Sequence, residues 1–320
     1  MRVLCAPNAF KGSLTAKEAA QAMARGVRRA GATPVILPVA DGGDGTAEVL
    51  GGRRVRMIAT GPYGERLPVE YRRKGSDAIV EVAQVGLART KKRDPMVARS
   101  TGLGEMIRHA AQRGATRIIV ALGGSATIDA GFGMLEGMVS PRSVPEIVAA
   151  CDVSTRFLDA PRLFGPQKGA TPEAIRKFEQ FFAYCRDRFP GGARAARLPG
   201  SGAAGGIGWA LALFHGAELR PGADLVLEEI RFHDALRHAD LVLTGEGRWD
   251  ATTREGKAPW AVVRAARRAG VPAVALCGTV VGPSRVARAI APSEKAGMRN
   301  AADLLEQASF RAVRGFEGNR

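Results

Sequence analysis

The sequence has few of the features that mark secreted, zinc-binding or membrane proteins. Its four cysteines, Cys5, Cys151, Cys185 and Cys277, are far apart and form no C-x-x-C pair. A disulfide framework or a zinc site is therefore not expected. No apolar run approaches the ~18 residues that a membrane-spanning helix needs. The first residues, Met1–Pro7, do not have the form of a secretion signal, so we expect a cytoplasmic protein that does not enter a membrane.

Aromatic residues are also scarce, at 6% of the chain, although 46% of the residues are hydrophobic. The apolar content is therefore mostly Ala, Val, Leu and Ile, and it is large enough for a sizeable core. Together with 40 glycines, this composition favours close packing of helices on sheets and many tight turns. A length of 320 residues is typical of two domains.

The charge balance is strongly basic, because 47 Lys and Arg face 31 Asp and Glu and give a net charge of +16. Such a balance raises the possibility of a nucleic-acid or other polyanion partner. The densest basic runs, Arg53–Arg56, Tyr71–Lys74 and Lys91–Arg93, are short, and Tyr71 is the one aromatic residue among them. Base-stacking surfaces need more aromatics. We favour a solvated basic surface that also attracts small anionic ligands over a nucleic-acid site.

The order of predicted elements indicates an α/β fold. A strand over 2–6, a helix capped by Ser13 or Thr15 and a strand over 34–39 form a unit typical of a parallel sheet. The strands that follow have no helix between them, which indicates antiparallel pairing; they cover residues 53–58, 68–71 and 78–82. From Asp240 the alternation of strand and helix returns, with a strand over 241–243, a helix over 258–269 and a strand over 271–276.

The simplest architecture has two domains. Both chain ends, residues 1–56 and 234–320, form a doubly wound, Rossmann-like domain with a parallel sheet. Residues 57–233 form an inserted domain of mixed α/β structure with further helices over 172–189 and 205–214. We detect no internal repeat and no low-complexity linker.

Glycine-rich turns with polar residues follow several of the predicted strands. The carboxyl ends of parallel strands are where open α/β sheets bind ligands. Glycine at such a turn lets backbone N–H groups approach a phosphate, and carboxylates there suit Mg²⁺, which prefers oxygen ligands. Four turns have this pattern: Ala40–Thr46, Leu122–Asp129, Leu243–Asp250 and Cys277–Thr279. One such turn is ordinary loop chemistry, but four at strand ends favour a phosphate site.

Two lysines fit the same picture. Lys168 lies between glycines in Phe164–Ala170, and Lys257 stands at the start of a helix, where the helix dipole already attracts anions. The segment Gly200–Gly205 matches G-x-G-x-x-G, but no strand precedes it. A nicotinamide site is thus not expected, and we predict a glycine-rich helix start that approaches a nucleotide or the neighbouring sheet. P-loop and protein-kinase motifs are absent from the sequence.

Taken together, these motifs closely resemble the bacterial glycerate kinase family whose members make 2-phosphoglycerate. The resemblance extends over most of the chain and keeps the order of the family's motifs. The matching segments are Ala6–Leu14, Ala40–Thr46, Gly123–Asp129, Ala150–Val153, Phe164–Ala170, Gly202–Gly206, Thr244–Asp250 and Gly256–Pro259.

The resemblance implies a two-domain α/β kinase with its active site in the cleft between the domains, Mg-ATP as the donor and D-glycerate as the acceptor. Phosphoryl transfer depends on positioning and charge neutralisation. Lys11, Lys168 and Arg248 would hold the glycerate carboxylate and the transferring group. An acidic residue, Asp41 or Asp250, would orient or deprotonate the attacking hydroxyl.

The remaining candidates divide into metal ligands and phosphate ligands. A metal ion or substrate hydroxyls would contact Asp44, Asp129, Asp152 and Glu246, and the division between base and metal ligand stays open. Besides Lys168, phosphate or substrate oxygens would contact Ser13, Gly42, Gly43, Gly123, Gly124, Ser125, Thr127, Gly202, Gly205 and Lys257.

The chain departs from the family pattern at several places. Asn8 stands where many relatives have Asp, the link Ser140–Pro145 is short, and Ser154–Arg156 replaces the usual Asp-Asn-Pro. The end of the chain after Cys277–Thr279 is also abbreviated. These departures keep alternatives open: a weakly active or non-catalytic member that binds a small hydroxy acid or a nucleotide, or a kinase for a related hydroxy acid. The sequence is compatible with a monomer or a homodimer.

Overall fold

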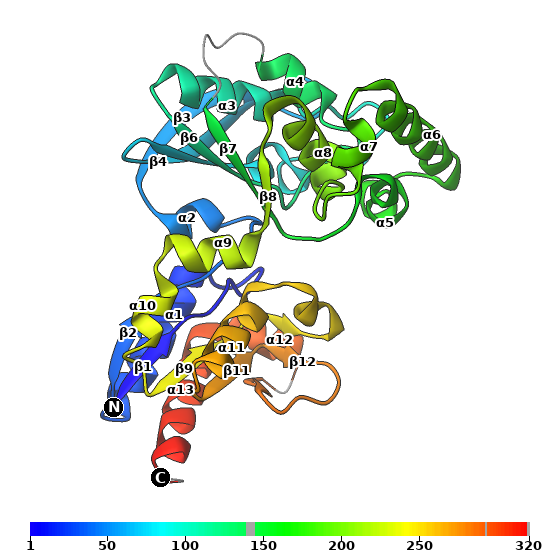
Figure 1. Cartoon of the computed structure of the whole chain (residues 1–320). Coiled ribbons are helices and arrows are strands. Elements are labelled where there is room, and N and C mark those ends of the chain that lie inside the picture. Colours follow the sequence, from blue (N-terminus) through cyan, green and yellow to red (C-terminus); the bar gives the residue numbers. More distant parts are fainter. Residues whose placement is uncertain (139–144, 292, 319–320) are drawn as a thin grey trace. The chain divides into compact units, whose positions relative to one another are not determined.

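The computed structural model describes residues 1–138, 145–291 and 293–318 (Figure 1). The chain forms two compact units. Met1–Asp41 and Ala223–Arg320 make one, called here the terminal unit, and Gly42–Gly222 make the other, the inserted unit. The chain therefore passes from one unit to the other between Asp41 and Gly42, and returns between Gly222 and Ala223. Both boundaries fall earlier in the sequence than those predicted after residues 56 and 233.

The terminal unit is built on a parallel sheet of five strands. The first strand of the chain lies inside this sheet and pairs in parallel with the second strand on one side and with β9 on the other. In spatial order the strands are β13 (Ala287–Ala289), β11 (Ala273–Cys277), β9 (Leu241–Thr244), β1 (Arg2–Cys5) and β2 (Thr33–Ile36).

Helices cover both faces of this sheet, which is the doubly wound arrangement predicted from the sequence. Along β1, Val3 and Cys5 contribute to the core on one face, and Leu4 contributes to the core on the other. The first face packs against α1 (Ala16–Arg29) and α13 (Ala301–Glu317). The second face packs against α9 (Gly222–Glu229), α10 (Phe232–Leu236) and α11 (Ala258–Arg268). Because both faces are buried, the central strands β1 and β9 are mostly apolar and buried, whereas the edge strands β2 and β13 are partly exposed.

Local sequence explains where α1 begins and how closely it packs. Thr15 Oγ1 accepts a hydrogen bond from Glu18 N at 3.2 Å, and Glu18 Oε2 accepts one from Thr15 N at 2.8 Å. This reciprocal capping box satisfies two N–H groups at the helix start, so Thr15, rather than Ser13, is the cap. A Cβ on Gly26 would lie 2.1 Å from the carbonyl oxygen of Glu306, which is why α1 and α13 can approach so closely.

The inserted unit is built on a mixed sheet of six strands. The first three strands pair antiparallel, as predicted, and the other pairings are parallel. In order, the strands are β3 (Arg53–Thr60), β4 (Arg66–Lys74), β5 (Asp77–Glu81), β6 (Arg117–Ala121), β7 (Glu146–Cys151) and β8 (Glu218–Pro221). The carboxyl ends of β5, β6 and β7 therefore lie side by side at one edge of this sheet.

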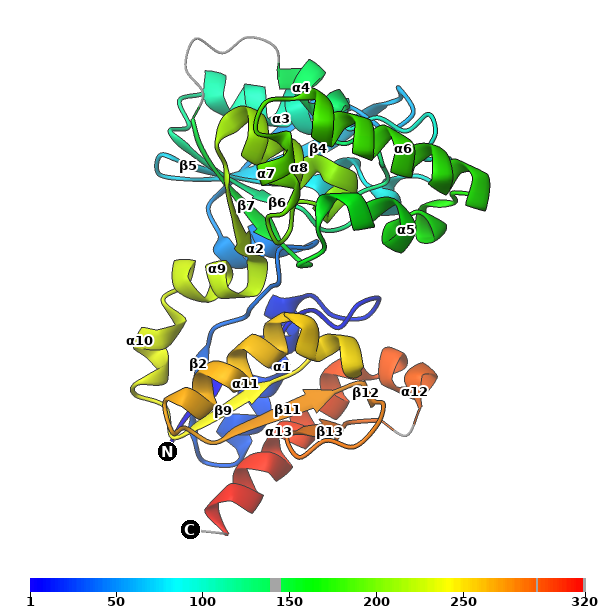
Figure 2. The same ribbon diagram turned by 45° about the vertical axis from the view of Figure 1, so that its right-hand side comes forward.

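Most of the protein's few aromatic residues belong to the inserted unit, whose helices are seen in Figures 1 and 2. Phe157 stacks on Phe182 and on Trp209, with ring centroids 4.3 and 4.5 Å apart. The helices of this unit are α2 (Thr46–Leu50), α3 (Thr101–Gln112), α4 (Phe132–Met138), α5 (Ala160–Phe164), α6 (Pro172–Arg188), α7 (Gly192–Ala196) and α8 (Ala203–His215). In the described parts of the chain, no helix is both long and apolar enough to span a bilayer.

All four cysteines are buried and free. Burial raises the pKa of the Cys5, Cys151 and Cys277 thiols to about 12 and that of Cys185 to about 11. A thiol with so high a pKa stays protonated near neutral pH and is a poor nucleophile. The cysteines are therefore part of the core.

The aromatic stack provides a test of the packing. Phe157 is 0% exposed, so Phe157→Ala should leave a cavity and lower the free energy of unfolding by about 3–5 kcal/mol. Tyr184→Ala is the matched control, because Tyr184 is 61% exposed and its loss should cost less than about 1 kcal/mol. Urea denaturation followed by circular dichroism measures both values, and equal losses would contradict the role given to the stack.

Candidate functional site

The predicted site residues form two clusters, one in each unit. In the terminal unit, the loops after β1 and β9 lie against each other. Asn8 N donates to Gly245 O at 2.9 Å, and a Cβ on Gly247 would lie 3.4 Å from Lys11 N. These contacts bring the Ala6–Leu14 segment to the Thr244–Asp250 segment, as expected for loops at neighbouring strand ends.

Two carboxylates of this cluster have distinct surroundings. Asp41 Oδ2 accepts a hydrogen bond from the Asn8 side-chain amide at 3.3 Å. Glu246 is 7% exposed and accepts a hydrogen bond from Thr253 Oγ1 at 2.8 Å. Burial raises the pKa of Glu246 to about 7, against the favourable charge of Lys257, and the nearby carboxylate of Asp41 adds to the rise. An aspartate at position 8 would set another negative charge beside Asp41, whereas Asn8 supplies a neutral donor.

Asp250 is engaged in local structure. Its Oδ1 accepts hydrogen bonds from the Thr252 N and Oγ1 at 3.0 and 2.6 Å, and its Oδ2 accepts one from Arg248 Nε at 3.2 Å. The Thr252 hydroxyl, with smaller contributions from Lys257 and Arg248, holds the pKa of Asp250 below its usual range. A lowered pKa weakens Asp250 as a proton acceptor.

Two cations of the terminal cluster, Lys257 and Arg248, lie beside its carboxylates. Lys257 Nζ lies 4.0 Å from both Glu246 Oε2 and Asp250 Oδ1. Arg248 and Lys11 are exposed and can reach a ligand. Ser13, predicted to bind substrate, instead closes its own turn, because its Oγ donates to the Phe10 carbonyl oxygen at 3.0 Å.

The second cluster, in the inserted unit, joins three of the predicted loops. Gly123 N donates to Gly42 O at 3.0 Å. A Cβ on Gly123 would lie 2.5 Å from Gly43 Cα and 3.1 Å from Asp152 Oδ2. No other residue fits at position 123, since such approaches are shorter than van der Waals contact. The loops after β6 and β7 and the start of the Gly42–Asp44 segment therefore converge at this glycine.

Lys168 holds the loop that follows Gly123. Its side chain is 3% exposed, and its Nζ donates to Ser125 Oγ at 2.7 Å and to the Thr127 carbonyl oxygen at 2.8 Å. Burial lowers the pKa of Lys168 to about 8, although the nearby carboxylates of Asp129 and Asp152 favour the charged form. The Thr127 hydroxyl is buried and has no hydrogen-bond partner among the described residues.

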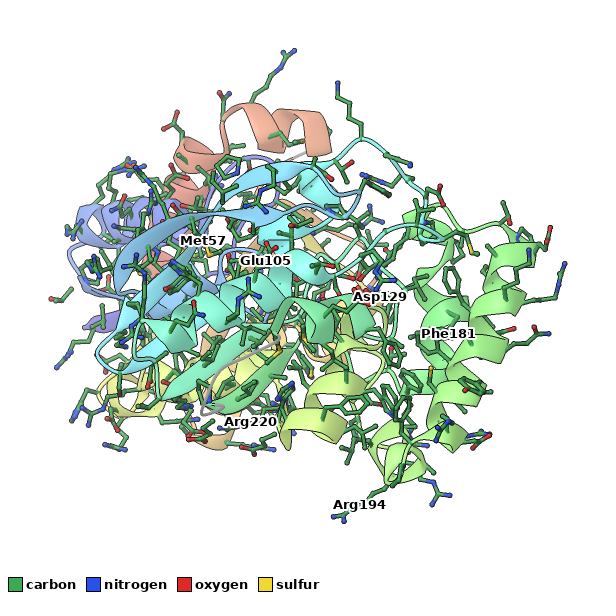
Figure 3. All side chains as sticks on the ribbon, turned by 90° about the horizontal axis from the view of Figure 1, so that it is seen from above. Met57, Glu105, Asp129, Phe181, Arg194 and Arg220 are labelled. Atoms are coloured by element: carbon green, nitrogen blue, oxygen red, sulfur yellow. The ribbon has the colours of Figure 1, made fainter. Side chains whose placement is uncertain are left out.

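Asp129, predicted as a metal ligand, is occupied by backbone groups. Its Oδ2 accepts hydrogen bonds from the Ser100 N and Oγ at 2.8 and 2.7 Å and from Gly133 N at 3.1 Å, and its Oδ1 accepts one from Gly131 N at 3.2 Å. Asp129, labelled in Figure 3, thus ties together the starts of α3 and α4. Few of its lone pairs stay open for a cation, which favours a structural role.

The glycines predicted to bind phosphate at the start of α8 are buried against backbone instead. A Cβ on Gly205 would lie 2.0 Å from the Thr127 carbonyl oxygen, and one on Gly202 would lie 2.4 Å from that of Arg156. Ala130 N also donates to Gly205 O at 3.0 Å. The glycine-rich start of α8 therefore packs against the backbone of the Gly123–Asp129 loop. This contact favours a packing role for these glycines over direct contact with phosphate.

The four predicted metal ligands are divided between the two units. Glu246 belongs to the terminal unit, and Asp44, Asp129 and Asp152 belong to the inserted unit. Among the described residues, no group of three or more His, Cys, Asp or Glu is placed to hold a metal ion. Magnesium is often bound by one or two carboxylates together with substrate phosphates. Asp44 and Asp152, on loops that meet at Gly123, fit that kind of site.

Sequence reasoning missed one buried carboxylate, Glu81, at the carboxyl end of β5. Glu81 is 5% exposed, and its Oε1 accepts a hydrogen bond from Ala47 N at 2.8 Å. Burial raises its pKa to about 7. The available signal was a glutamate inside the apolar run Ala78–Val82, next to the neighbouring strand end that carries Gly123.

Comparison with known proteins identifies related chains. The model of the glycerate kinase family matches residues 3–141 and 137–311. The glycerate kinase of Bacillus subtilis (strain 168) is 35% identical over an alignment of 326 positions, gaps included. The alignment covers 88% of this chain and 85% of that protein. The glycerate 2-kinase of Escherichia coli (strain K12) is 33% identical over 327 residues, 88% and 86% of the two chains.

A solved structure gives the same picture. The crystal structure of a glycerate kinase 2 from Salmonella typhimurium LT2 superposes with a TM-score of 0.83 at 33% identity, and the match covers 100% of this chain and 99% of that chain.

The comparisons also locate the shortened segment. The alignment with the Bacillus subtilis protein is longer than this 320-residue chain although it covers 88% of it. That relative therefore has residues inside the matched region that this chain lacks. The two blocks of the family model meet at residues 137–141, at the end of α4. The short link Ser140–Pro145 falls mostly on residues 139–144, which lie outside the described residues.

Titration of Lys168 gives a test of the inserted cluster. Its pKa is about 8 in the folded protein and 10.5 ordinarily, so the unfolded chain binds more protons between these values and folding stability should rise with pH there. From pH 8 to pH 10, the free energy of unfolding of the wild type should gain about 2 kcal/mol relative to Lys168→Met. Urea denaturation at both pH values measures this difference, and parallel profiles would show that Lys168 titrates normally.

Proposed function

The chain belongs to the glycerate kinase family, and from this premise we propose that it transfers the γ-phosphoryl group of ATP to D-glycerate and forms 2-phosphoglycerate. The family is one of kinases, and the Escherichia coli relative is named for phosphorylation at the 2-position. The observation that supports the proposal most directly is the Gly123–Thr127 loop, held by the buried ammonium of Lys168.

The donor's phosphates suit the cluster of the inserted unit. Phosphoryl transfer needs little covalent help from the protein, and positioning with charge neutralisation supplies most of the rate. In the Gly123–Thr127 loop, Gly124 is exposed and belongs to a glycine turn of the kind that binds phosphate, and Lys168 keeps the loop in one conformation. Asp44 and Asp152 would hold a magnesium ion, which would neutralise charge on the phosphate oxygens when bound.

The acceptor's chemistry suits the cluster of the terminal unit. Arg248 and Lys11 provide cations for the glycerate carboxylate. Asp41 would orient the attacking hydroxyl and accept its proton, with the Asn8 amide holding the carboxylate in place at 3.3 Å. The two clusters are covalently joined, because Asp41 ends the first stretch of the terminal unit and Gly42 begins the inserted unit. We propose that both act in one reaction.

The activity is tested with purified protein, ATP, Mg²⁺ and D-glycerate. ADP formation that depends on glycerate is the expected result, and phosphorus NMR of the product should show 2-phosphoglycerate. A 3-phosphoglycerate signal would refute the proposed position of transfer. Absence of glycerate-dependent ADP would refute glycerate as the acceptor and leave a non-catalytic binding protein or a kinase for a related hydroxy acid.

The choice between Asp41 and Asp250 is tested by a matched pair of variants. Asp41→Asn should lower kcat by roughly 100-fold or more, the usual scale for loss of a positioned proton acceptor. Asp250→Asn should lower kcat by roughly 10-fold or less. The change weakens the contacts of residue 250 with Arg248 and Thr252, but it leaves the proposed proton acceptor, Asp41, intact. A stronger effect at Asp250 in steady-state assays would reverse the assignment.

A further inference from the structure

We propose that Glu81 is a positioning residue for the reaction, because it anchors the Gly42–Ala47 segment to the edge of the inserted sheet beside the Gly123–Thr127 loop. The expected effect of Glu81 on kcat rests on the proposed function. The expected anchoring of the Gly42–Ala47 segment rests on the structure alone.

The carboxylate of Glu81 is hydrogen-bonded to that segment. Its Oε1 accepts a hydrogen bond from Ala47 N at 2.8 Å, and the nearby Gly45 N and Gln84 side chain oppose part of the rise in its pKa. Gln84 is itself fixed, because its Oε1 accepts a hydrogen bond from Glu70 N at 3.2 Å. At 5% exposure, Glu81 contacts no substrate directly. It acts through the backbone that carries Gly43 and Asp44.

The same strand end holds the second loop of the cluster. Glu81 pairs with Ala121 at the ends of the parallel strands β5 and β6, two residues before Gly123. Leu87, which follows shortly after Glu81, donates its N–H to the Gly124 carbonyl oxygen at 2.9 Å. The end of β5 and the turns that follow it therefore contact both segments whose backbones meet at Gly123.

Stability alone gives a weak reason for a carboxylate at this position. Burying an ionised carboxyl is unfavourable unless hydrogen bonds offset it, and the nearby charge of Asp44 adds repulsion. The Ala47 N–H donates to Glu81, however, and a charged carboxylate makes a stronger hydrogen bond with it than a neutral amide oxygen would. The carboxylate thus fixes a segment that carries two predicted ligand-binding residues, Gly43 and Asp44.

The test uses Glu81→Gln, Glu81→Asp and a matched control. Glu105→Gln is the control, because Glu105 also lies in the inserted unit and accepts from Thr60 N and Oγ1 at 2.7 and 2.9 Å, far in sequence from the site loops. Glu81→Gln should lower kcat by roughly 10- to 100-fold, the scale of a small misplacement of reacting groups. The KM values for both substrates should change less than about threefold in the same variant.

The conservative variant separates positioning from general damage. Glu81→Asp keeps both acceptor oxygens and should recover part of the lost kcat, whereas Glu105→Gln should keep kcat within about threefold of wild type. Unchanged kcat in Glu81→Gln would overturn the inference. So would an equal loss of kcat in Glu81→Gln and Glu105→Gln.

A second measurement does not depend on catalysis. Hydrogen–deuterium exchange, followed by mass spectrometry of peptides that cover residues 42–50, should be at least about tenfold faster in Glu81→Gln than in wild type and Glu105→Gln, since lost hydrogen bonds raise local opening. Unchanged exchange would refute the anchor even if activity fell. A wild-type protein inactive on glycerate would refute the proposed function and leave the anchor to be judged by exchange.

Discussion

The candidate site depends first on the burial of one cation. Lys168 loses hydration inside the inserted unit, and its ammonium group recovers part of that cost from Ser125, from the Thr127 carbonyl and from the carboxylates of Asp129 and Asp152. Each of these partners belongs to a loop at a strand end, so the loops are held in one arrangement relative to Lys168. Lys168, which the sequence predicts as a phosphate ligand, therefore also fixes the backbone of the loops around it.

Glycine provides the second constraint, because the loops can meet only where side chains are missing. Gly123 lies against Gly43 and the carboxylate of Asp152, and Gly205 lies against the Thr127 carbonyl oxygen. A methyl group at either position would displace backbone, which cannot move away as a flexible side chain could. The high glycine content thus reflects convergence of loops as much as tight turns. The same residues bring polar groups from β6, β7 and α8 into one cluster.

The sequence was sufficient to predict the fold class, the antiparallel start of the inserted sheet and the segments that carry the clusters, because strand order and glycine-rich turns are local patterns. The bonding state of single residues was not predictable. Asp129 is taken up by Ser100, which is 29 positions away, and Asp250 is restrained by the neighbouring Thr252 and Arg248. Glu81 resembled part of an apolar strand until Ala47, 34 positions away, was placed beside it. Side-chain roles of this kind follow from contacts between distant segments.

The four cysteines have a practical consequence. Because every native thiol is buried and has a pKa of about 11 or higher, alkylating reagents near neutral pH should react slowly with the folded chain. A single cysteine introduced at an exposed position would be the most reactive thiol present. Fluorescent or spin labels could then be attached at chosen points of either unit without first replacing the native residues, which also fill the core.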